Sequence, residues 1–236
     1  MDRFSNKTIT NWIFDLDNTL YPAECNLFAQ IDQKMGAFIA ELLDVDLKQA
    51  RRVQKDYYYR YGTTLNGLMQ EHKLDPQSYL DYVHDIDHSV LPSLPDLKSE
   101  LDELPGRKFI FTNGSFFHGE KVADALGVLD AFDGIFDIAA ADFVPKPHSG
   151  AYERFLKQHN VDPLQAVMFE DLHPNLRMPH EMGMTTVLVH SGYDDHPSQK
   201  ERLSWQQLPD YIHFETDDLV AMLQKINVSL SIDELP

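Results

Sequence analysis

Short apolar segments alternate with amphipathic segments along most of the chain. Five runs are apolar over nearly their full length, which is typical of parallel strands covered on both faces; they span residues 11–14, 108–112, 134–139, 166–169 and 185–189. Apolar residues at helical spacing predict helices over residues 97–104, 119–129, 150–160 and 216–226, the last with Thr216 as its N-cap. This alternation predicts an α/β fold with a Rossmann-like open parallel sheet.

The stretch from Pro22 to Leu91 interrupts the alternation. It contains no convincing strand, and its apolar residues recur at helical spacing over residues 28–42, 47–61 and two shorter segments. We therefore predict an all-helical domain, residues 22–91, inserted after the first strand. Residues 1–21 and 92–236 are expected to form the α/β core domain.

The charge balance limits the classes of partner. The 236 residues include 38 acidic and 20 basic side chains, for a formal net charge of −18. Such a surface repels nucleic-acid phosphates and anionic membranes, so we expect neither a nucleic-acid polymer nor a membrane as partner. A small anionic substrate remains compatible, because a bound metal ion or a lysine can reverse the field inside one cleft.

The cysteine content and the first residues bear on the cellular compartment. Cys25 is the only cysteine, so no intrachain disulfide can form. The opening segment "MDRFSNKTIT" is polar and lacks the apolar stretch of a signal peptide, and no run reaches the length of a transmembrane helix. We expect a cytoplasmic protein.

Polar or charged groups follow four of the five predicted strands. They belong to Asp15 and Asp17; Thr112, Asn113 and the backbone of Gly114; Lys146; and Glu170 and Asp171. Ligands of open α/β sheets bind beyond the carboxyl ends of the strands. Each motif alone is more simply a capped turn or a solvated charge, but their common position predicts one site.

In their order along the chain, Asp15-Leu-Asp17-Asn-Thr19, Thr112-Asn113-Gly114, Lys146-Pro147 and Glu170-Asp171 resemble the four motifs of the haloacid dehalogenase-like hydrolase superfamily. The likeness covers nearly the whole chain, and the helical insert resembles the first class of cap domain. The segments "DLDNTLYP", "YYYRYGTTLNGL", "FTNG" and "GMTTVLV" resemble the pyrimidine 5′-nucleotidase-like branch more than the phosphoglycolate phosphatase or mutase branches. The resemblance implies a Mg²⁺-dependent phosphomonoester hydrolase that acts on a pyrimidine nucleoside 5′-monophosphate.

The resemblance also implies the chemical roles. Asp15 would be the nucleophile that forms an aspartyl-phosphate, and Asp17 the general acid and then the general base. That role calls for a pKa of Asp17 nearer to neutrality than usual, whereas the metal would lower the pKa of Asp15. The phosphate would be bound by Thr112, by the amides of Asn113 and Gly114, and by the charge of Lys146.

Magnesium prefers hard oxygen ligands. The carboxylates of Asp15 and Asp171 and the backbone carbonyl of Asp17 supply three of them. The fourth motif departs slightly from that of many relatives, because the position four residues after Asp171 is the neutral Asn175. We expect Asp171 to contact the metal, with Glu170 and Asn175 behind it.

Three features of the helical insert permit more than one interpretation. In the run Tyr57–Tyr61, Tyr57 and Tyr61 share a helix face that either packs inward or offers aromatic surface to a nucleobase. Asn66 and the small Gly67 are candidates for substrate contact. His84 and His88 are four residues apart, but two histidines leave a metal short of ligands, so a solvated or partly buried helix end is the better interpretation.

Three alternative functions remain open. The same fold could act on another small phosphate, such as phosphoglycolate or a sugar phosphate. A haloacid dehalogenase would need neither Mg²⁺ nor Asp17, because a halide leaving group takes no proton. A non-catalytic binding protein would have no need of mutually repelling carboxylates.

Overall fold

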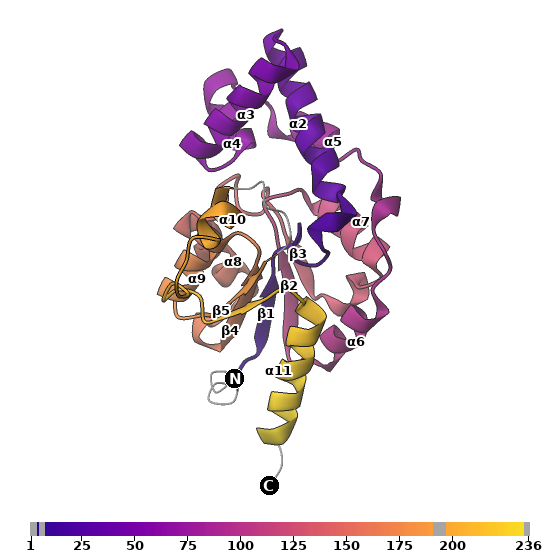
Figure 1. Cartoon of the computed structure of the whole chain (residues 1–236), viewed down its shortest axis with the longest axis vertical. Coiled ribbons are helices and arrows are strands. Elements are labelled where there is room, and N and C mark those ends of the chain that lie inside the picture. Colours follow the sequence, from indigo (N-terminus) through magenta and orange to yellow (C-terminus); the bar gives the residue numbers. More distant parts are fainter. Residues whose placement is uncertain (1–3, 5–7, 191–196, 234–236) are drawn as a thin grey trace.

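A six-stranded parallel sheet forms the centre of the molecule (Figure 1). The computed structural model describes Phe4, residues 8–190 and residues 197–233. The strands are β1 (Asn11–Phe14), β2 (Arg107–Phe111), β3 (Gly134–Phe136), β4 (Ala166–Glu170), β5 (Thr185–Val189) and β6 (Phe214–Thr216), in the order β3-β2-β1-β4-β5-β6. The predicted α/β fold is thus confirmed, and β6 adds an edge strand that the apolar pattern does not indicate.

The strand β1 lies between β2 and β4, where the strand order reverses. Phe14 is opposite Ile110 of β2 and Phe169 of β4, and the amide of Asp15 extends the ladder by donating to the carbonyl of Phe169 at 2.9 Å. A crevice opens at such a reversal point, beyond the carboxyl ends of the strands. Asp15 and Glu170 are the residues that the two adjacent strands deliver there.

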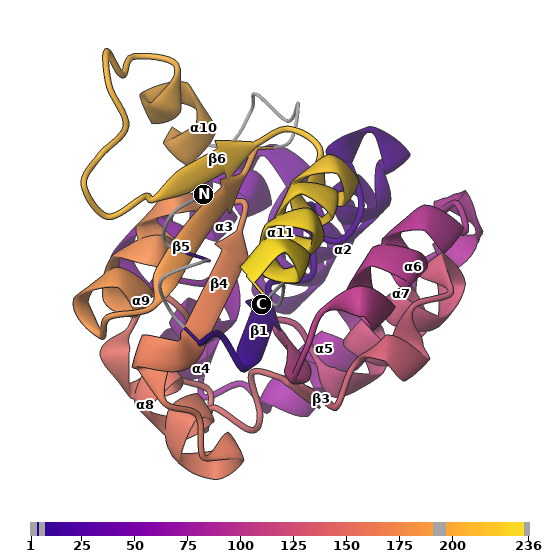
Figure 2. The ribbon, with the colours of Figure 1, turned by 90° about the horizontal axis from the view of Figure 1, so that it is seen from below.

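Helices cover both faces of the sheet, as Figure 2 shows. The helices α6 (Pro95–Glu103), α7 (Phe116–Leu126) and α11 (Leu219–Asp233) pack with Trp12 and Phe14 in one apolar cluster. The helices α8 (Ser149–His159) and α9 (Arg177–Glu181) pack with Ile13 on the opposite face. Alternate residues of β1 therefore enter different cores, which is why this strand is apolar throughout. A further helix, α10 (Pro197–Arg202), precedes β6.

The helical insert contains α2 (Leu27–Leu43), α3 (Leu47–Tyr61), α4 (Thr64–His72) and α5 (Pro76–Val83). Figure 1 shows these helices gathered beyond the carboxyl ends of the strands. They have an apolar cluster of their own, which includes Ile31, Ile39, Leu68 and Leu80. Two residues of the loops after β3, Ile138 and Phe143, join this cluster and so connect the insert to the sheet.

Side-chain caps move some predicted boundaries. The helix α7 begins at Phe116 because the Ser115 hydroxyl accepts from the amide of His118. The helix α11 begins at Leu219, where the carboxylate of Asp218 accepts from the amide of Ala221. The prediction that Thr216 is the N-cap is therefore wrong, since Thr216 ends β6.

Two observations bear on the expected compartment. Among the described residues, no helix combines the length and the apolar character that crossing a bilayer requires. Most of the polar opening segment, from which a cytoplasmic location was expected, lies outside the described residues.

Candidate active site

The turn after β1 brings Asp15 and Asp17 to the same edge of the sheet. The amides of Thr19 and Leu20 both donate to the carbonyl of Leu16, at 3.3 and 3.0 Å. This tight turn requires a positive φ of 60° at Asn18, a conformation that asparagine tolerates better than most residues. The sequence "DLDNT" therefore encodes the reversal that keeps both carboxylates near the strand end.

The ammonium of Lys146 lies at the centre of the site. It donates to Asp15 Oδ1 at 2.6 Å, to Glu170 Oε2 at 2.7 Å and to the carbonyl of Phe111 at 2.8 Å. Lys146 is only 2% exposed, and its three hydrogens match these three acceptors. Lys146, which was predicted to bind phosphate, therefore already donates all its hydrogens to protein acceptors. A phosphate oxygen would have to replace one of them.

The charges of this group oppose one another. Burial raises the pKa of Asp15 to about 7, with Glu170 acting in the same direction and Lys146 against both. Burial alone would lower the pKa of Lys146, but the attraction of Asp15 and Glu170 raises it above its ordinary value. Burial and the charges of Asp15 and Glu170 also raise the pKa of Asp171 well above its ordinary value.

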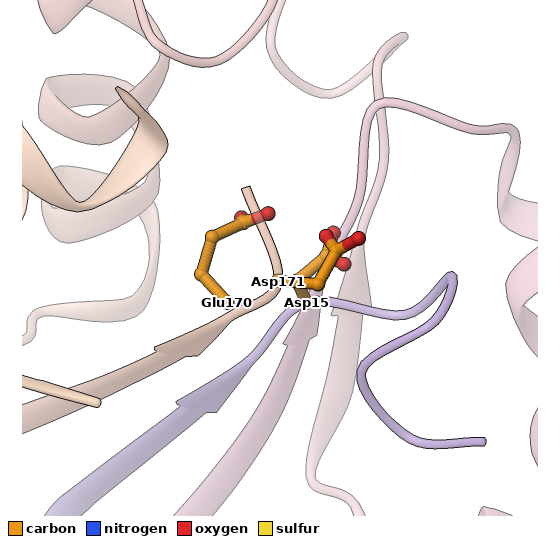
Figure 3. Close-up of side chains that lie close together, drawn as sticks. All are labelled: Asp15, Glu170 and Asp171. Carbon is orange, nitrogen blue, oxygen red and sulfur yellow. The ribbon is translucent and has the colours of Figure 1, made fainter. Parts of the chain in front are cut away.

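Asp15, Glu170 and Asp171 each contribute one carboxylate oxygen to a group whose atoms lie within 4.8 Å of one another (Figure 3). All three residues are buried. With Lys146 they carry a formal excess of two negative charges, which a divalent cation would neutralise. This donor set fits Mg²⁺, since it consists of hard oxygens and carries the complementary charge.

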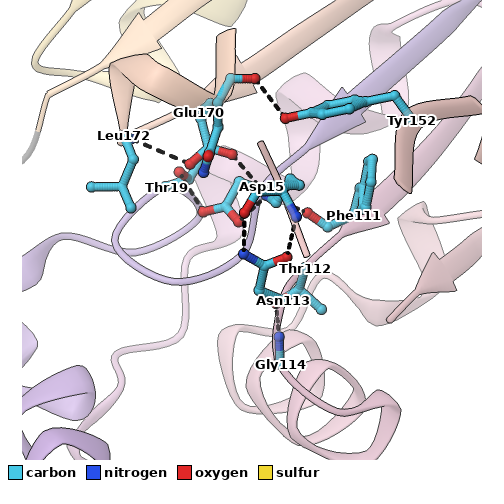
Figure 4. A network of polar contacts seen from close by, with 11 residues as sticks. Asp15, Thr19, Phe111, Thr112, Asn113, Gly114, Tyr152, Glu170 and Leu172 are labelled. Carbon is cyan, nitrogen blue, oxygen red and sulfur yellow. Dashed lines mark hydrogen bonds and ion pairs between the residues drawn. The ribbon is translucent and has the colours of Figure 1, made fainter. Parts of the chain in front are cut away.

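The loop after β2 holds the phosphate-binding candidates in place (Figure 4). The amide side chain of Asn113 donates to the carbonyl of Lys146 at 3.1 Å and accepts from its amide at 2.8 Å. The amide of Gly114 donates to the hydroxyl of Thr112 at 2.9 Å. Within the described residues no acceptor takes the hydroxyl hydrogen of Thr112, so this hydrogen can be donated to a phosphate oxygen.

The surroundings of Asp17 differ from those of Asp15. Its Oδ1 accepts from the hydroxyl of Tyr21 at 2.6 Å and lies 2.9 Å from Nε2 of His118. Burial alone would raise the pKa of Asp17, but its interactions with His118 and Tyr21 lower it below its ordinary value. The expected pKa order of the two aspartates is thus reversed. Asp15 has carboxylate neighbours, which raise its pKa, whereas Asp17 has hydrogen-bond donors, which lower its pKa.

The sequence patterns missed several side chains that contact the two aspartates. The Thr19 hydroxyl donates to Asp15 Oδ2 at 3.0 Å, and Tyr21 stands in the same motif, four residues after Asp17. His118 is 101 positions from Asp17 and is completely buried on α7. No spacing in the sequence indicates its proximity to Asp17.

The two interpretations of the tyrosine run in the insert apply to different residues. Tyr57 is buried in the insert, as predicted for the inward face. Tyr58 is half-buried. Burial raises its pKa to about 12, and the charges of Asp171 and then Glu170 contribute to that rise. Within the run, Tyr58 is therefore the tyrosine whose pKa is affected by the carboxylate cluster.

Two other candidates in the insert have contacts within it. The side chain of Asn66 donates to the carbonyl of Tyr61 at 2.9 Å and accepts from Gln70 at 3.2 Å. A Cβ at Gly67 would approach the ring of Tyr57 to 2.5 Å, so close packing accounts for the small residue there. Substrate contact by Asn66 stays a prediction, and it would require the present hydrogen bonds to rearrange.

The remaining predicted residues lie around the same edge. Asn175 is buried in the short helix after β4, and its carbonyl accepts from the hydroxyl of Tyr152 at 2.7 Å. The ring of His84 stacks on that of His118, with centroids 4.4 Å apart, and the centroid of His88 lies 5.8 Å from that of His118. His84 and His88 thus lie in a cluster of aromatic rings, and among the described residues the only group of three or more histidine, cysteine or acidic side chains placed to hold a metal ion is the carboxylate cluster.

Comparison with known proteins places the chain. A family model described as haloacid dehalogenase-like hydrolase matches residues 10–183. The chain is 29% identical over 196 residues to Phosphate metabolism protein 8 of Saccharomyces cerevisiae, a match that covers 75% of this chain and 60% of the yeast protein. The aligned part thus spans less than two thirds of that relative.

Solved structures with the same architecture differ in chemistry. A haloacid dehalogenase-superfamily phosphatase from Thermococcus onnurineus aligns with a TM-score of 0.59 at 18% identity, over 92% of this chain and 97% of its own. An L-2-haloacid dehalogenase from Xanthobacter autotrophicus aligns with a TM-score of 0.55, also at 18% identity, over 92% of this chain and 98% of its own. These similarities show the fold and do not distinguish a phosphoryl substrate from a carbon–halogen substrate.

Proposed function

Because the chain belongs to the haloacid dehalogenase-like hydrolase family, we propose that it is a Mg²⁺-dependent phosphomonoesterase that uses Asp15 as nucleophile and Asp17 as general acid and base. The observation that carries the proposal is the pair of aspartates in contrasting surroundings. Asp15 is bonded to Lys146 within an anionic cluster, whereas Asp17 is held apart by Tyr21 and His118. Carboxylates with different surroundings can perform different tasks in one reaction.

The proposed reaction has two steps. In the first, an Asp15 oxygen bonds to phosphorus, the ester P–O bond breaks, and the leaving oxygen takes a proton from Asp17. In the second, Asp17 accepts a proton from water, the water oxygen bonds to phosphorus, and the bond to Asp15 breaks to release phosphate. Mg²⁺ bound by Asp15, Asp171 and the carbonyl of Asp17, with Glu170 beside them, would neutralise the charge of the phosphoryl oxygens.

Two groups support binding of the phosphoryl oxygens. Thr112 has a hydroxyl hydrogen to donate, and Lys146 places a positive charge next to Asp15. The amides of Asn113 and Gly114 complete the proposed phosphate site, once the Gly114 amide exchanges the Thr112 hydroxyl for a phosphate oxygen. Such oriented donors stabilise the charge that develops during transfer.

The proposed substrate is a pyrimidine nucleoside 5′-monophosphate. Tyr58 supports it, because this half-buried aromatic ring comes from the insert and lies within electrostatic reach of Asp171. A ring near the phosphate site can contact the planar part of a leaving group. We further propose that residues 22–91 act as a cap that closes over the substrate and excludes water during attack.

The cellular setting belongs to the same proposal. We place the protein in the cytoplasm, which agrees with a single cysteine and a half-exposed thiol at Cys25. The expected partner is the small phosphomonoester itself. A nucleic-acid polymer is disfavoured by the net charge of −18.

The alternatives make different demands on the site. Another small phosphate, such as phosphoglycolate or a sugar phosphate, would use the same carboxylates and differ only in its contacts with the insert. A dehalogenase would leave Asp17 and the excess of two negative charges without a task, since it needs neither a proton donor nor a cation. The name of the yeast relative refers to phosphate metabolism, which agrees with a phosphoryl substrate.

One substrate panel tests the proposal. Phosphate release is measured from UMP, CMP, AMP, GMP, phosphoglycolate and glucose 6-phosphate, with Mg²⁺ and with a chelator, and halide release from 2-chloropropionate. We expect Mg²⁺-dependent release that is highest for UMP or CMP, and its loss in Asp15→Asn. Preference for another phosphate would replace the substrate assignment, and halide release without phosphate release would overturn the proposed function. Activity that persists in Asp15→Asn would exclude Asp15 as the nucleophile.

A further inference from the structure

The two oxygens of Asp17 have unequal surroundings. Oδ1 receives both the hydroxyl of Tyr21 at 2.6 Å and Nε2 of His118 at 2.9 Å. Within the part of the chain that the structure describes, Oδ2 has no hydrogen-bond partner. The side chain keeps 17% of its surface exposed. The carboxylate is therefore anchored through one oxygen, and the other is available to a ligand.

We propose that Tyr21 and His118 are positioning residues that reserve Oδ2 of Asp17 as the atom that exchanges the proton. This inference rests on the proposed function, because it assigns a task to each oxygen of the same general acid. A protonated carboxyl group has one oxygen that carries hydrogen and one that only accepts. The two donors on Oδ1 lower the pKa of Asp17; when the group is protonated they make Oδ1 the acceptor, so the hydrogen resides on Oδ2.

The same anchoring serves both steps of the reaction. During attack on the ester, Oδ2–H gives its proton to the leaving oxygen while Oδ1 keeps both hydrogen bonds. During hydrolysis of the aspartyl-phosphate, the ionised Oδ2 accepts a proton from water. The carboxylate need not rotate between the steps, because neither donor is released. A fixed orientation of the proton-transfer group is what general acid–base catalysis requires.

The ring of His118 is itself fixed by the insert. It is completely buried, and the ring of His84 stacks on it at 4.4 Å with an interplanar angle of 8°. Nδ1 of His84 lies 2.9 Å from the hydroxyl of Ser115, the N-cap of the helix that carries His118. His84 is the C-cap of α5 in the insert, so a segment of the insert supports the residue that orients Asp17.

The hydrogen-bond role of His118 toward Asp17 follows from its contacts. Nε2 faces a carboxylate oxygen, so we assign the ring hydrogen to this nitrogen. Nδ1 is buried and has no partner among the described residues. His118 therefore acts on Asp17 as a hydrogen-bond donor of fixed direction.

The test compares two substrates in Tyr21→Phe, His118→Leu, His118→Gln and the double variant Tyr21→Phe/His118→Leu. UMP has a poor leaving group that needs the proton of Asp17, whereas p-nitrophenyl phosphate has a good one that does not. For UMP we expect kcat to fall about tenfold in each single variant and about 100-fold in the double variant, with KM within about twofold of wild type. His118→Gln should recover most of the rate, because its amide nitrogen can replace Nε2.

With p-nitrophenyl phosphate the rate of the first turnover should stay within about twofold of wild type, because the leaving group needs no acid. Hydrolysis of the intermediate still needs Asp17, so Tyr21→Phe and His118→Leu should give a burst of one p-nitrophenolate per site before a slow steady state. Tyr82→Phe, which removes a hydroxyl from the insert, is the matched control and should behave as wild type. Urea unfolding of each variant checks that the fold is intact.

Three outcomes overturn the inference. Wild-type kcat for UMP in both single variants would show that the donors do not matter. An equal loss for UMP and for the first turnover of p-nitrophenyl phosphate, without a burst, would mean that they support the fold only. If the wild-type protein releases phosphate from neither substrate, the proposed function fails and the inference fails with it, whereas the first two outcomes leave the proposed function standing.

Discussion

Lys146 places its ammonium 2.6 Å from Oδ1 of Asp15, although 131 positions separate the two residues in the sequence. The same nitrogen lies 2.7 Å from Glu170. One buried cation thus holds two strand ends together and lessens the repulsion between their carboxylates. After this pairing the cluster keeps a formal excess of negative charge, which would attract a cation.

Removing this ammonium should destabilise the metal-free protein. Lys146→Met leaves Asp15 and Glu170 buried without their counter-charge, and the loss of one partner from a buried ion pair lowers the unfolding free energy by about 3–5 kcal/mol. Urea unfolding at pH 7.5 measures the change. Lys157→Met on the exposed side of α8 is the matched control and should change stability by less than about 0.5 kcal/mol. A loss of that small size in Lys146→Met would contradict the assigned role.

The stability of the metal-free protein should decrease as pH rises toward neutrality. The pKa of Asp15 is about 7 in the folded chain and 3.8 when unperturbed, so between these values the folded state binds more protons. The stabilisation contributed by protonated Asp15 is complete below the unfolded pKa and is lost as pH rises through the folded pKa. Unfolding free energies from pH 4.5 to 8 in a chelator should show this slope, and Asp15→Asn should have a flatter profile. Identical slopes would exclude Asp15 as its source.

Magnesium should reverse that destabilisation near neutral pH. A cation that binds only the folded state adds about 2.7 kcal/mol at 100 times its Kd, and here it relieves the repulsion among Asp15, Glu170 and Asp171. The melting temperature should therefore rise with Mg²⁺ at pH 7.5. Asp171→Asn should abolish most of this rise, whereas Asp124→Asn on α7 should not affect it. A full rise in Asp171→Asn would place the metal elsewhere.

Tyr58 should affect substrate binding more than turnover. It is the tyrosine of the run whose pKa is raised by Asp171 and Glu170, so Tyr58→Ala removes aromatic surface next to the site. We expect KM for the best substrate of the panel to rise about tenfold with kcat within about threefold. The neighbouring Tyr59 is 65% exposed, and Tyr59→Ala should leave both constants unchanged. Equal effects of the two substitutions would remove Tyr58 from the site.

Two glycines of the insert should respond oppositely to alanine. A Cβ at Gly67 would meet the Tyr57 ring at 2.5 Å, whereas a Cβ at Gly36 would meet only the side chain of Gln54 at 3.7 Å. Gly67→Ala should lower the unfolding free energy by about 1–3 kcal/mol through overpacking. Gly36→Ala should raise it by up to about 1 kcal/mol, since alanine favours the interior of α2. Urea unfolding distinguishes the two, and a stabilised Gly67→Ala would show that the Tyr57 ring can move.

The local sequence determined most of the sheet and most of the polar residues at its carboxyl edge. The apolar runs of β1, β2, β4 and β5 match the observed strands because buried parallel strands must be apolar on both faces. Asp15 and Asp171 follow β1 and β4 directly, so their meeting at one edge follows from strand polarity alone, whereas Lys146 stands further along in the loop after β3. The edge strand β6 escaped prediction because two of its three residues are only partly buried, the third, Glu215, is exposed, and they carry no such pattern.

Tertiary structure decided which group acts on which carboxylate. The sequence supplied two aspartates two residues apart, but only the fold places Lys146 at Asp15 and His118 at Asp17. The pKa order of the pair therefore differs from the expected one, since a pKa depends on burial and on neighbours distant in sequence. The orientation of Tyr58 and the packing of Gly67 were decided in the same way. A pattern along the chain specifies which residues reach an edge, and packing in three dimensions specifies what each of them contacts.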